Sequence, residues 1–175
     1  VLKVNYETGA LLDVIGQPNL TTLQSVGKYV RPDGSVADFR QPDGSISIDN
    51  ERNLYFGGFY GQNKVLRIPL PIQRNPQGVV WSSGEMLRES MNQISGRTMN
   101  DNYGCNRWGD QLYVCDGPRM LVWTNYRAAA TFAHAAYVVG QDSFERRDQP
   151  GGPLGAGGGA ICSGSNFVFV ACDWS

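Results

Sequence analysis

The sequence predicts an all-β protein built from a repeated unit, on two observations. Three short segments are versions of one strand: residues 1–4 (VLKV), 65–68 (VLRI) and 120–123 (MLVW). Three longer runs share a second pattern of β-branched and aromatic residues: NLYFGG from Asn53, QLYVCD from Gln111 and FVFVACD from Phe167. The spacing divides the chain into three units, residues 1–64, 65–119 and 120–175.

Each unit is predicted to contain four short strands. A short apolar stretch stands one turn before the aromatic strand, at residues 45–49 (SISID), 103–106 (YGCN) and 160–163 (AICS), so the two form a hairpin. The VL-type strand follows, and a fourth strand is expected at residues 11–15, 78–81 and 137–139. The first and third of these continue as VIGQPNL and VVGQDSF, which fixes the register of the repeat independently. Four antiparallel strands per unit are typical of a β-propeller blade.

One stretch of the chain is similar to a known repeat. Residues 39–68, FRQPDGSISIDNERNLYFGGFYGQNKVLRI, resemble an NHL-type repeat, in which a Pro and Gly turn leads into a strand, an Asp-containing hairpin, an LYV strand and an NRVL strand. The second unit departs from it, because MNDNYG at residues 99–104 replaces the Pro and Gly entry. The third replaces most of that entry with glycine. The resemblance implies a propeller fold and says little about a ligand.

Three blades are too few for a ring, which needs about four to eight. On the repeat register the strand at residues 1–4 belongs to a preceding blade, and the third unit ends before a VL-type strand of its own. We therefore expect two copies to join reciprocally into a six-bladed ring, each first strand completing the other copy's last blade. A head-to-tail contact through the same strand would give a fibre. The alternative is that the chain is a fragment or processed product of a longer propeller.

Composition narrows the class of protein. The chain of 175 residues has 22 glycines and 9 prolines, as expected for a β protein dense in turns. Its formal net charge of −1 offers no basic face for nucleic acid. We expect no membrane span, because no apolar run approaches the length of about 18 residues that one requires.

The cysteines predict disulfides and, through them, a location. Cys105 and Cys115 are ten residues apart and flank a hairpin turn, and so do Cys162 and Cys172. An antiparallel register is expected to place each pair face to face, and each disulfide would contribute about 2.5 to 3 kcal/mol. Buried thiols are the alternative. Disulfides would make the protein secreted and extracellular.

A glycosylation triplet stands at Asn19, followed by Leu20 and Thr21. It falls in a segment expected to be a surface turn after a strand, which is where an acceptor asparagine must lie. The sequence therefore marks Asn19 as a glycan acceptor if the chain is secreted by a eukaryote.

The search for catalytic chemistry yields little. His134, the single histidine, lies in an alanine-rich stretch and is interpreted as structural. Propeller hydrolases and lactonases gather acidic and amide ligands at one end of the channel, and the corresponding positions here are Asp43, Asp101 and Asn102. The third unit has only Gly158 and Gly159 there. We expect no catalytic residue, cofactor or metal, with Ca²⁺ bound by two copies together as the weaker alternative.

Aromatic residues in predicted loops are the remaining binding candidates: Phe59, Tyr60 and Trp108, a possible surface for sugar or protein. The sequence thus favours a non-enzymatic extracellular module, structural or binding, that assembles through its terminal strands. Two alternatives stay open: a metal-dependent propeller hydrolase or lyase, and a fragment of a larger propeller that binds a glycan or protein.

Overall fold

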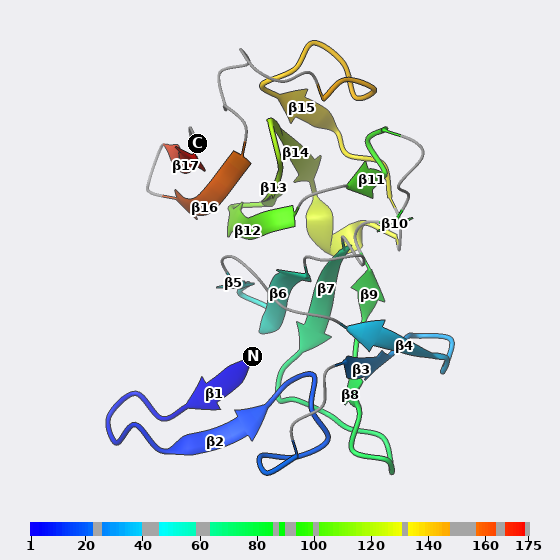
Figure 1. Cartoon of the computed structure of the whole chain (residues 1–175), viewed down its shortest axis with the longest axis vertical. Helices are drawn as coiled ribbons and strands as arrows, with labels where there is room; N and C mark the ends of the chain where they lie inside the picture. The colour runs from blue at the N-terminus through cyan, green and yellow to red at the C-terminus, as the bar shows by residue number, and fades with distance from the viewer. Residues whose placement is uncertain are drawn as a thin grey trace.

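The computed structural model is all-β (Figure 1). It describes residues 1–22, 26–39, 46–58, 64–85, 88–89, 94–99, 102–130, 133–147, 157–163 and 167–173. Within these ranges the helical structure is limited to one 3₁₀ turn, η1 (Tyr126–Ala128). The all-β prediction is therefore confirmed.

Two four-stranded antiparallel sheets form the centre of the molecule. In the first meander, β5 (Ile46–Ile48), β6 (Asn53–Gly58), β7 (Lys64–Pro69) and β9 (Gly84–Glu85) pair in that order. In the second meander, the order is β12 (Asn102–Trp108), β13 (Gln111–Asp116), β14 (Arg119–Thr124) and β15 (Tyr137–Val139). We call β5–β6 and β12–β13 the leading pairs, and β7–β9 and β14–β15 the trailing pairs.

Two separate hairpins flank the meanders along the chain. The N-terminal hairpin consists of β1 (Leu2–Val4) and β2 (Leu11–Val14), and the C-terminal hairpin of β16 (Gly157–Ser163) and β17 (Val168–Asp173). In Figure 1 the C-terminal hairpin lies beside β12, which it contacts, and the N-terminal hairpin lies at the other end, below β5 and β6. The strands expected from the repeat at these places are thus present.

The first unit contains strands that the sequence analysis did not predict. β3 (Gly27–Val30) and β4 (Val36–Phe39) form a hairpin around the turn at Arg31 to Ser35, where Gly34 has a φ of 84°. In the second unit a strand was expected at residues 78–81; a strand is present over part of this segment, but it does not join the sheet of β7. β8 (Val80–Trp81) pairs in parallel with β3, and β9 takes the fourth place because Ser82 and Ser83 bond to the carbonyl of Arg67 on β7.

A short parallel pair, β10 (Arg88–Glu89) with β11 (Thr98–Met99), completes the described strands.

The sheets stack face to face around three apolar clusters. Between the two meanders, Tyr55 and Val65 pack against a set from the second meander that includes Cys105, Leu112, Val114, Leu121 and Trp123. The opposite face of the first meander packs against Ile15 and Tyr29, with Val1 at the margin. The opposite face of the second meander packs against Val168 of the C-terminal hairpin. Burial of these faces orders the sheets in a row.

A buried ion pair fixes the turn between β13 and β14. The Asp116 carboxylate and the Arg119 guanidinium are 2.6 Å apart, and both side chains are buried. Arg119 also donates to the carbonyl of Thr98 at 2.7 Å and to that of Phe144. One guanidinium therefore ties strand β11 and the loop after β15 to the second meander, and its five donors make this possible.

Replacing Arg119 with alanine should lower the free energy of unfolding by about 3 to 5 kcal/mol, because the buried Asp116 carboxylate would lose its closest partner. Urea denaturation measures the change. The control is Lys28→Ala, which removes a pair to Asp38 that is exposed on both sides and should cost less than about 1 kcal/mol. Equal losses in the two variants would contradict the structural role given to Arg119.

Candidate functional site

The two hairpins leave sheet edges open. Among the described strands β1 is hydrogen-bonded to β2 alone, and β17 to β16 alone. β7 and β14, the strands that share the VL pattern with β1, are paired on both sides. An open edge presents a row of backbone donors and acceptors that another strand can pair with.

The N-terminal hairpin has the register of a trailing pair. Leu2 lies opposite Val14 and Lys3 opposite Asp13, as Leu121 lies opposite Val138 and Val122 opposite Tyr137. Val1 and Ile15 exchange both backbone hydrogen bonds, at 3.0 and 2.8 Å, at the position of the pair Met120 and Val139. β1–β2 therefore corresponds to the trailing pair β14–β15. Among the described strands, no leading pair such as β12–β13 is hydrogen-bonded to it.

The alternation of hydrogen bonds identifies which backbone groups of β1 face outward. Because Val1 exchanges both its bonds with Ile15, the next residue, Leu2, occupies a non-hydrogen-bonded position. The N–H and C=O of Leu2 therefore point to the open edge. Its side chain is 64% exposed, and Val4 is exposed as well.

An apolar face is exposed on β5 of the first meander. Ile46 lies opposite Phe56 and Ile48 opposite Leu54, so all four side chains share one face. Phe56 and Leu54 are buried in the cluster that includes Ile15, whereas Ile46 and Ile48 are 51% and 50% exposed. This β5 face, defined as Ile46 and Ile48, extends the apolar face that Leu54 and Phe56 form on β6.

The C-terminal hairpin exposes a second apolar surface. Phe167 and Phe169 are both exposed, and their ring centroids are 6.4 Å apart. Val168, between them, packs against the second meander. Because successive side chains of a strand alternate, the two phenylalanines point away from that meander.

The predicted disulfide between Cys105 and Cys115 is not formed, and both thiols are buried. The turn has two residues, Gly109 and Asp110, and therefore places Cys105 opposite Val114 and Cys115 opposite Gly104. The two cysteines are off by one position, and their side chains pack in clusters on opposite faces of the sheet. The expected face-to-face register was wrong for this reason.

The second predicted pair, Cys162 and Cys172, is described by its backbone alone, so its disulfide stays a prediction. Cys162 lies opposite Phe169, and Cys172 lies opposite Gly158. A register shift between Gly158 and Ile161 separates the two cysteines further along the ladder. The backbone therefore does not bring Cys162 and Cys172 opposite one another.

Asn19 lies in an exposed turn after β2, as expected. Its Oδ1 accepts hydrogen bonds from the Thr21 amide at 2.9 Å, the Thr21 hydroxyl at 3.0 Å and the Thr22 amide at 2.8 Å. The asparagine and the threonine of the triplet are thus in contact on the surface. Whether a glycan is attached stays a prediction.

The other candidate residues are only partly described. Asp43, Asp101, Phe59 and Tyr60 lie outside the described residues, and Asn102 is described by its backbone, opposite Asp116. Trp108 ends β12 and is 40% exposed. Within the described ranges no three acidic, histidine or cysteine side chains are grouped as a metal site requires. His134 packs edge-on against Phe144, with ring centroids 4.5 Å apart.

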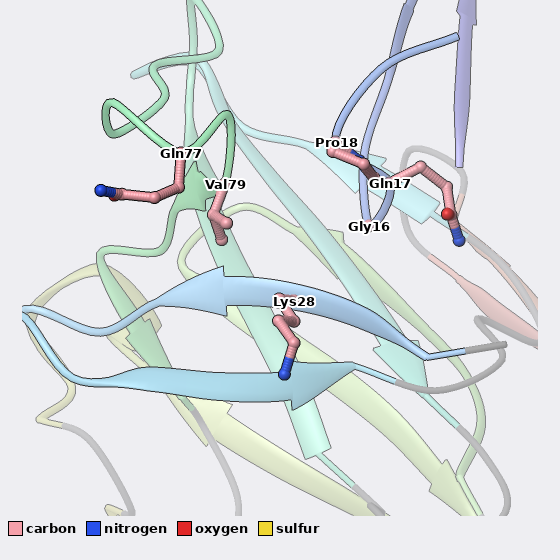
Figure 2. A pocket seen from close by; sticks show the side chains of 6 residues that line it. All are labelled: Gly16, Gln17, Pro18, Lys28, Gln77 and Val79. Carbon is pink, nitrogen blue, oxygen red and sulfur yellow. The ribbon is translucent and has the colours of Figure 1, made fainter. Parts of the chain in front are cut away.

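A small hollow lies between the turn after β2, strand β3 and the loop before β8. Its volume is about 210 Å³, and the lining residues are Gly16, Gln17, Pro18, Lys28, Gln77 and Val79. Figure 2 shows the side chains of Gln17 and Gln77 pointing away from each other, and the Lys28 ammonium is bonded to Asp38 at 3.0 Å. Ligand sites are larger and bring polar groups together, so this hollow is a poor candidate.

A buried charge network joins β3 to the first meander. The Glu85 carboxylate lies 3.0 Å from Arg31 Nε and 3.8 Å from Lys64 Nζ. Lys64 also donates to the Tyr29 hydroxyl at 3.0 Å. Burial raises the pKa of Glu85 to about 7. The network is placed to hold the β3–β4 hairpin against β7 and β9.

Comparison with known proteins adds no family. No protein-family model matches the chain, and no curated protein matches it. In the part of the chain that the structure describes, no helix is long and apolar enough to cross a membrane. Among the described residues, the candidate interaction surfaces are the open edge of β1, the β5 face and the exposed phenylalanines of the C-terminal hairpin.

The buried thiols should be protected in the folded protein. Burial raises the pKa of Cys105 to about 12, so the reactive thiolate is scarce as well as inaccessible. We expect iodoacetamide to leave Cys105 and Cys115 unmodified under native conditions and to alkylate both in urea without reductant. Peptide mass mapping reads each site separately. Failure to alkylate in urea until reductant is added would show a disulfide instead.

Glu85 should make stability depend on pH. Its pKa is raised from an ordinary 4.5 to about 7, so between these values the folded chain holds a proton that the unfolded chain has released. The free energy of unfolding should therefore fall through this window as pH rises, and Glu85→Gln should lack this component. Urea denaturation of both proteins at pH 4.5 and 7.5 tests this. An unchanged difference between them at the two values would refute it.

Proposed function

We propose that the protein is a non-enzymatic assembly module, in which the open edge of β1 accepts a strand from a second copy. The sheets are proposed to be NHL-like propeller blades, and the strand added to β1 is β17 of the other copy. The composite sheet would have the order β16–β17–β1–β2. It would then match the two meanders, each a leading pair followed by a trailing pair.

The observation that carries this proposal is the register of the N-terminal hairpin. Its Cα partners match those of β14–β15, and Val1 and Ile15, which exchange both backbone hydrogen bonds, stand where Met120 and Val139 pair. β14 is paired on its other side with β13, whereas no described strand pairs with the corresponding side of β1. Addition of a strand there satisfies the outward N–H and C=O of Leu2, which is the basis of recognition by β-augmentation.

Reciprocal exchange also accounts for closure. If the described meanders and terminal hairpins are counted, and the β4–β3–β8 sheet and the β10–β11 pair are left aside, a pair of copies would have six four-stranded sheets, within the range of propeller rings. A two-fold pair satisfies both edges at once, whereas head-to-tail addition continues indefinitely. A secreted location is a further part of the proposal, and among the described residues it is supported by the exposed turn at Asn19.

Light scattering coupled to size exclusion tests the assembly. We expect a mass twice the 19.2 kDa of the chain. Leu2→Pro removes the outward N–H of β1 while sparing its bonds to β2, and should give a monomer. Leu2→Thr keeps the N–H and a strand-forming side chain, so it should remain a dimer. A wild-type monomer, or equal masses for the two variants, would refute assembly through this edge.

A further inference from the structure

We infer a second contact surface between the copies: the β5 face, Ile46 and Ile48, is covered by Phe167 and Phe169 of the other copy's C-terminal hairpin. This inference rests on the proposed assembly but concerns a sheet face and not an edge. Its residues are distinct from the backbone groups of β1. The two contacts can therefore be broken separately.

The phenylalanines correspond to residues that contact the next sheet. The aromatic strands share a central triplet, Leu54-Tyr55-Phe56 on β6, Leu112-Tyr113-Val114 on β13 and Val168-Phe169-Val170 on β17. Tyr55 is fully buried in the cluster between the first and second meanders. Tyr113 is buried in the cluster that also contacts Val168 of the C-terminal hairpin. Phe169, the third member, is 59% exposed.

The β5 face corresponds to a surface that receives such an aromatic residue. Ile46 pairs with Phe56, and Cys105 pairs with Val114, the matching residue of the second meander. Cys105 is completely buried in the cluster that contains Tyr55. Ile46 is half exposed, so the repeat predicts an aromatic side chain at this place too.

The neighbouring position supports the same equivalence. Ile48 pairs with Leu54, and Arg107 pairs with Leu112 on the second meander. Arg107 reaches back to the first meander, where it donates to the carbonyl of Ile48 and to Asn50 Oδ1. Both positions on β12 that correspond to Ile46 and Ile48 thus contact the preceding sheet. On β5 the same positions lie on the face that packs against Ile15 and Tyr29, yet both isoleucine side chains remain half exposed.

A second copy is the occupant that fits this surface. The C-terminal hairpin has a leading pair's place in the repeat, and the N-terminal hairpin is a trailing pair. When β17 of one copy pairs with β1 of the other, the outward face of the C-terminal hairpin lies against the first meander of that other copy. Two apolar surfaces that are exposed in one chain are then buried against each other, which favours association.

Substitution of Ile46 separates this contact from the edge. Ile46→Asp should raise the dissociation constant of the dimer about tenfold or more, because a carboxylate would be buried against the phenylalanines. Val36→Asp is the matched control, since Val36 is a β-branched residue exposed to the same degree, 52%, on β4 of another sheet. It should leave the constant unchanged. Sedimentation equilibrium gives both values, and circular dichroism verifies that each variant is folded.

A photo-cross-linking residue at position 48 identifies the occupant directly. In a mixture of ¹⁵N-labelled and unlabelled chains, irradiation should join position 48 of one copy to the peptide containing Phe167 and Phe169 of the other. Adducts to any other peptide, or no adducts in a sample shown to be dimeric, would overturn the inference. If Leu2→Pro dissociates the dimer while Ile46→Asp behaves like Val36→Asp, the edge contact stands and the face contact fails. A wild-type monomer removes both.

Discussion

The structure depends on one constraint, that a sheet with two apolar faces must have a neighbour on each. The first meander satisfies it through Tyr55 and Val65 on one face and Leu54, Phe56, Leu66 and Ile68 on the other. Each of these faces is buried against a different part of the chain. Sheets in such a row depend on the hydrophobic effect for their order, since backbone hydrogen bonds hold each sheet but do not join it to the next.

Arginine side chains reinforce the stacking where the sheets end. Arg107 joins the second meander to the first, and Arg67 donates to the carbonyl of Arg127 at 2.8 Å in the opposite direction. Arg74 joins the loop before β8 to Asp13 of the N-terminal hairpin at 2.7 Å. These contacts are planar, multidentate and partly buried, a combination that guanidinium groups support better than ammonium groups. They fix the orientation of sheets that apolar burial alone would leave free to slide.

The same constraint explains the position of the candidate site, which lies toward the two ends of the row of sheets, where apolar side chains of the described strands are exposed. The β5 face and the pair Phe167 and Phe169 are apolar surfaces at positions where the meanders bury their counterparts. The open edge of β1 is a backbone surface at a position where β14 is paired. The proposed contacts between copies thus lie where surfaces that are buried in one meander are exposed at the corresponding place in another sheet.

The sequence by itself determined the second meander, the two terminal hairpins and three strands of the first meander. The alternation of apolar residues and the shared VL and LYV patterns located β1, β2, β5, β6, β7 and the strands from β12 to β17, because these signals are local to each strand. They also matched β1 to β14, and these two strands pair with β2 and β15 in the same register over three residues.

Only the tertiary structure decided which strands pair when they are not joined by a short turn. It placed β9, and not residues 78–81, beside β7, and it gave β8 to β3, because pairing over such distances depends on side-chain contacts that a local pattern does not contain. A turn of two residues moved Cys115 from opposite Cys105 to opposite Gly104, and so to the other face. The exposure of Ile46, Ile48 and Phe169 was likewise invisible in the sequence, since an apolar residue in a strand looks the same whether or not another sheet covers it.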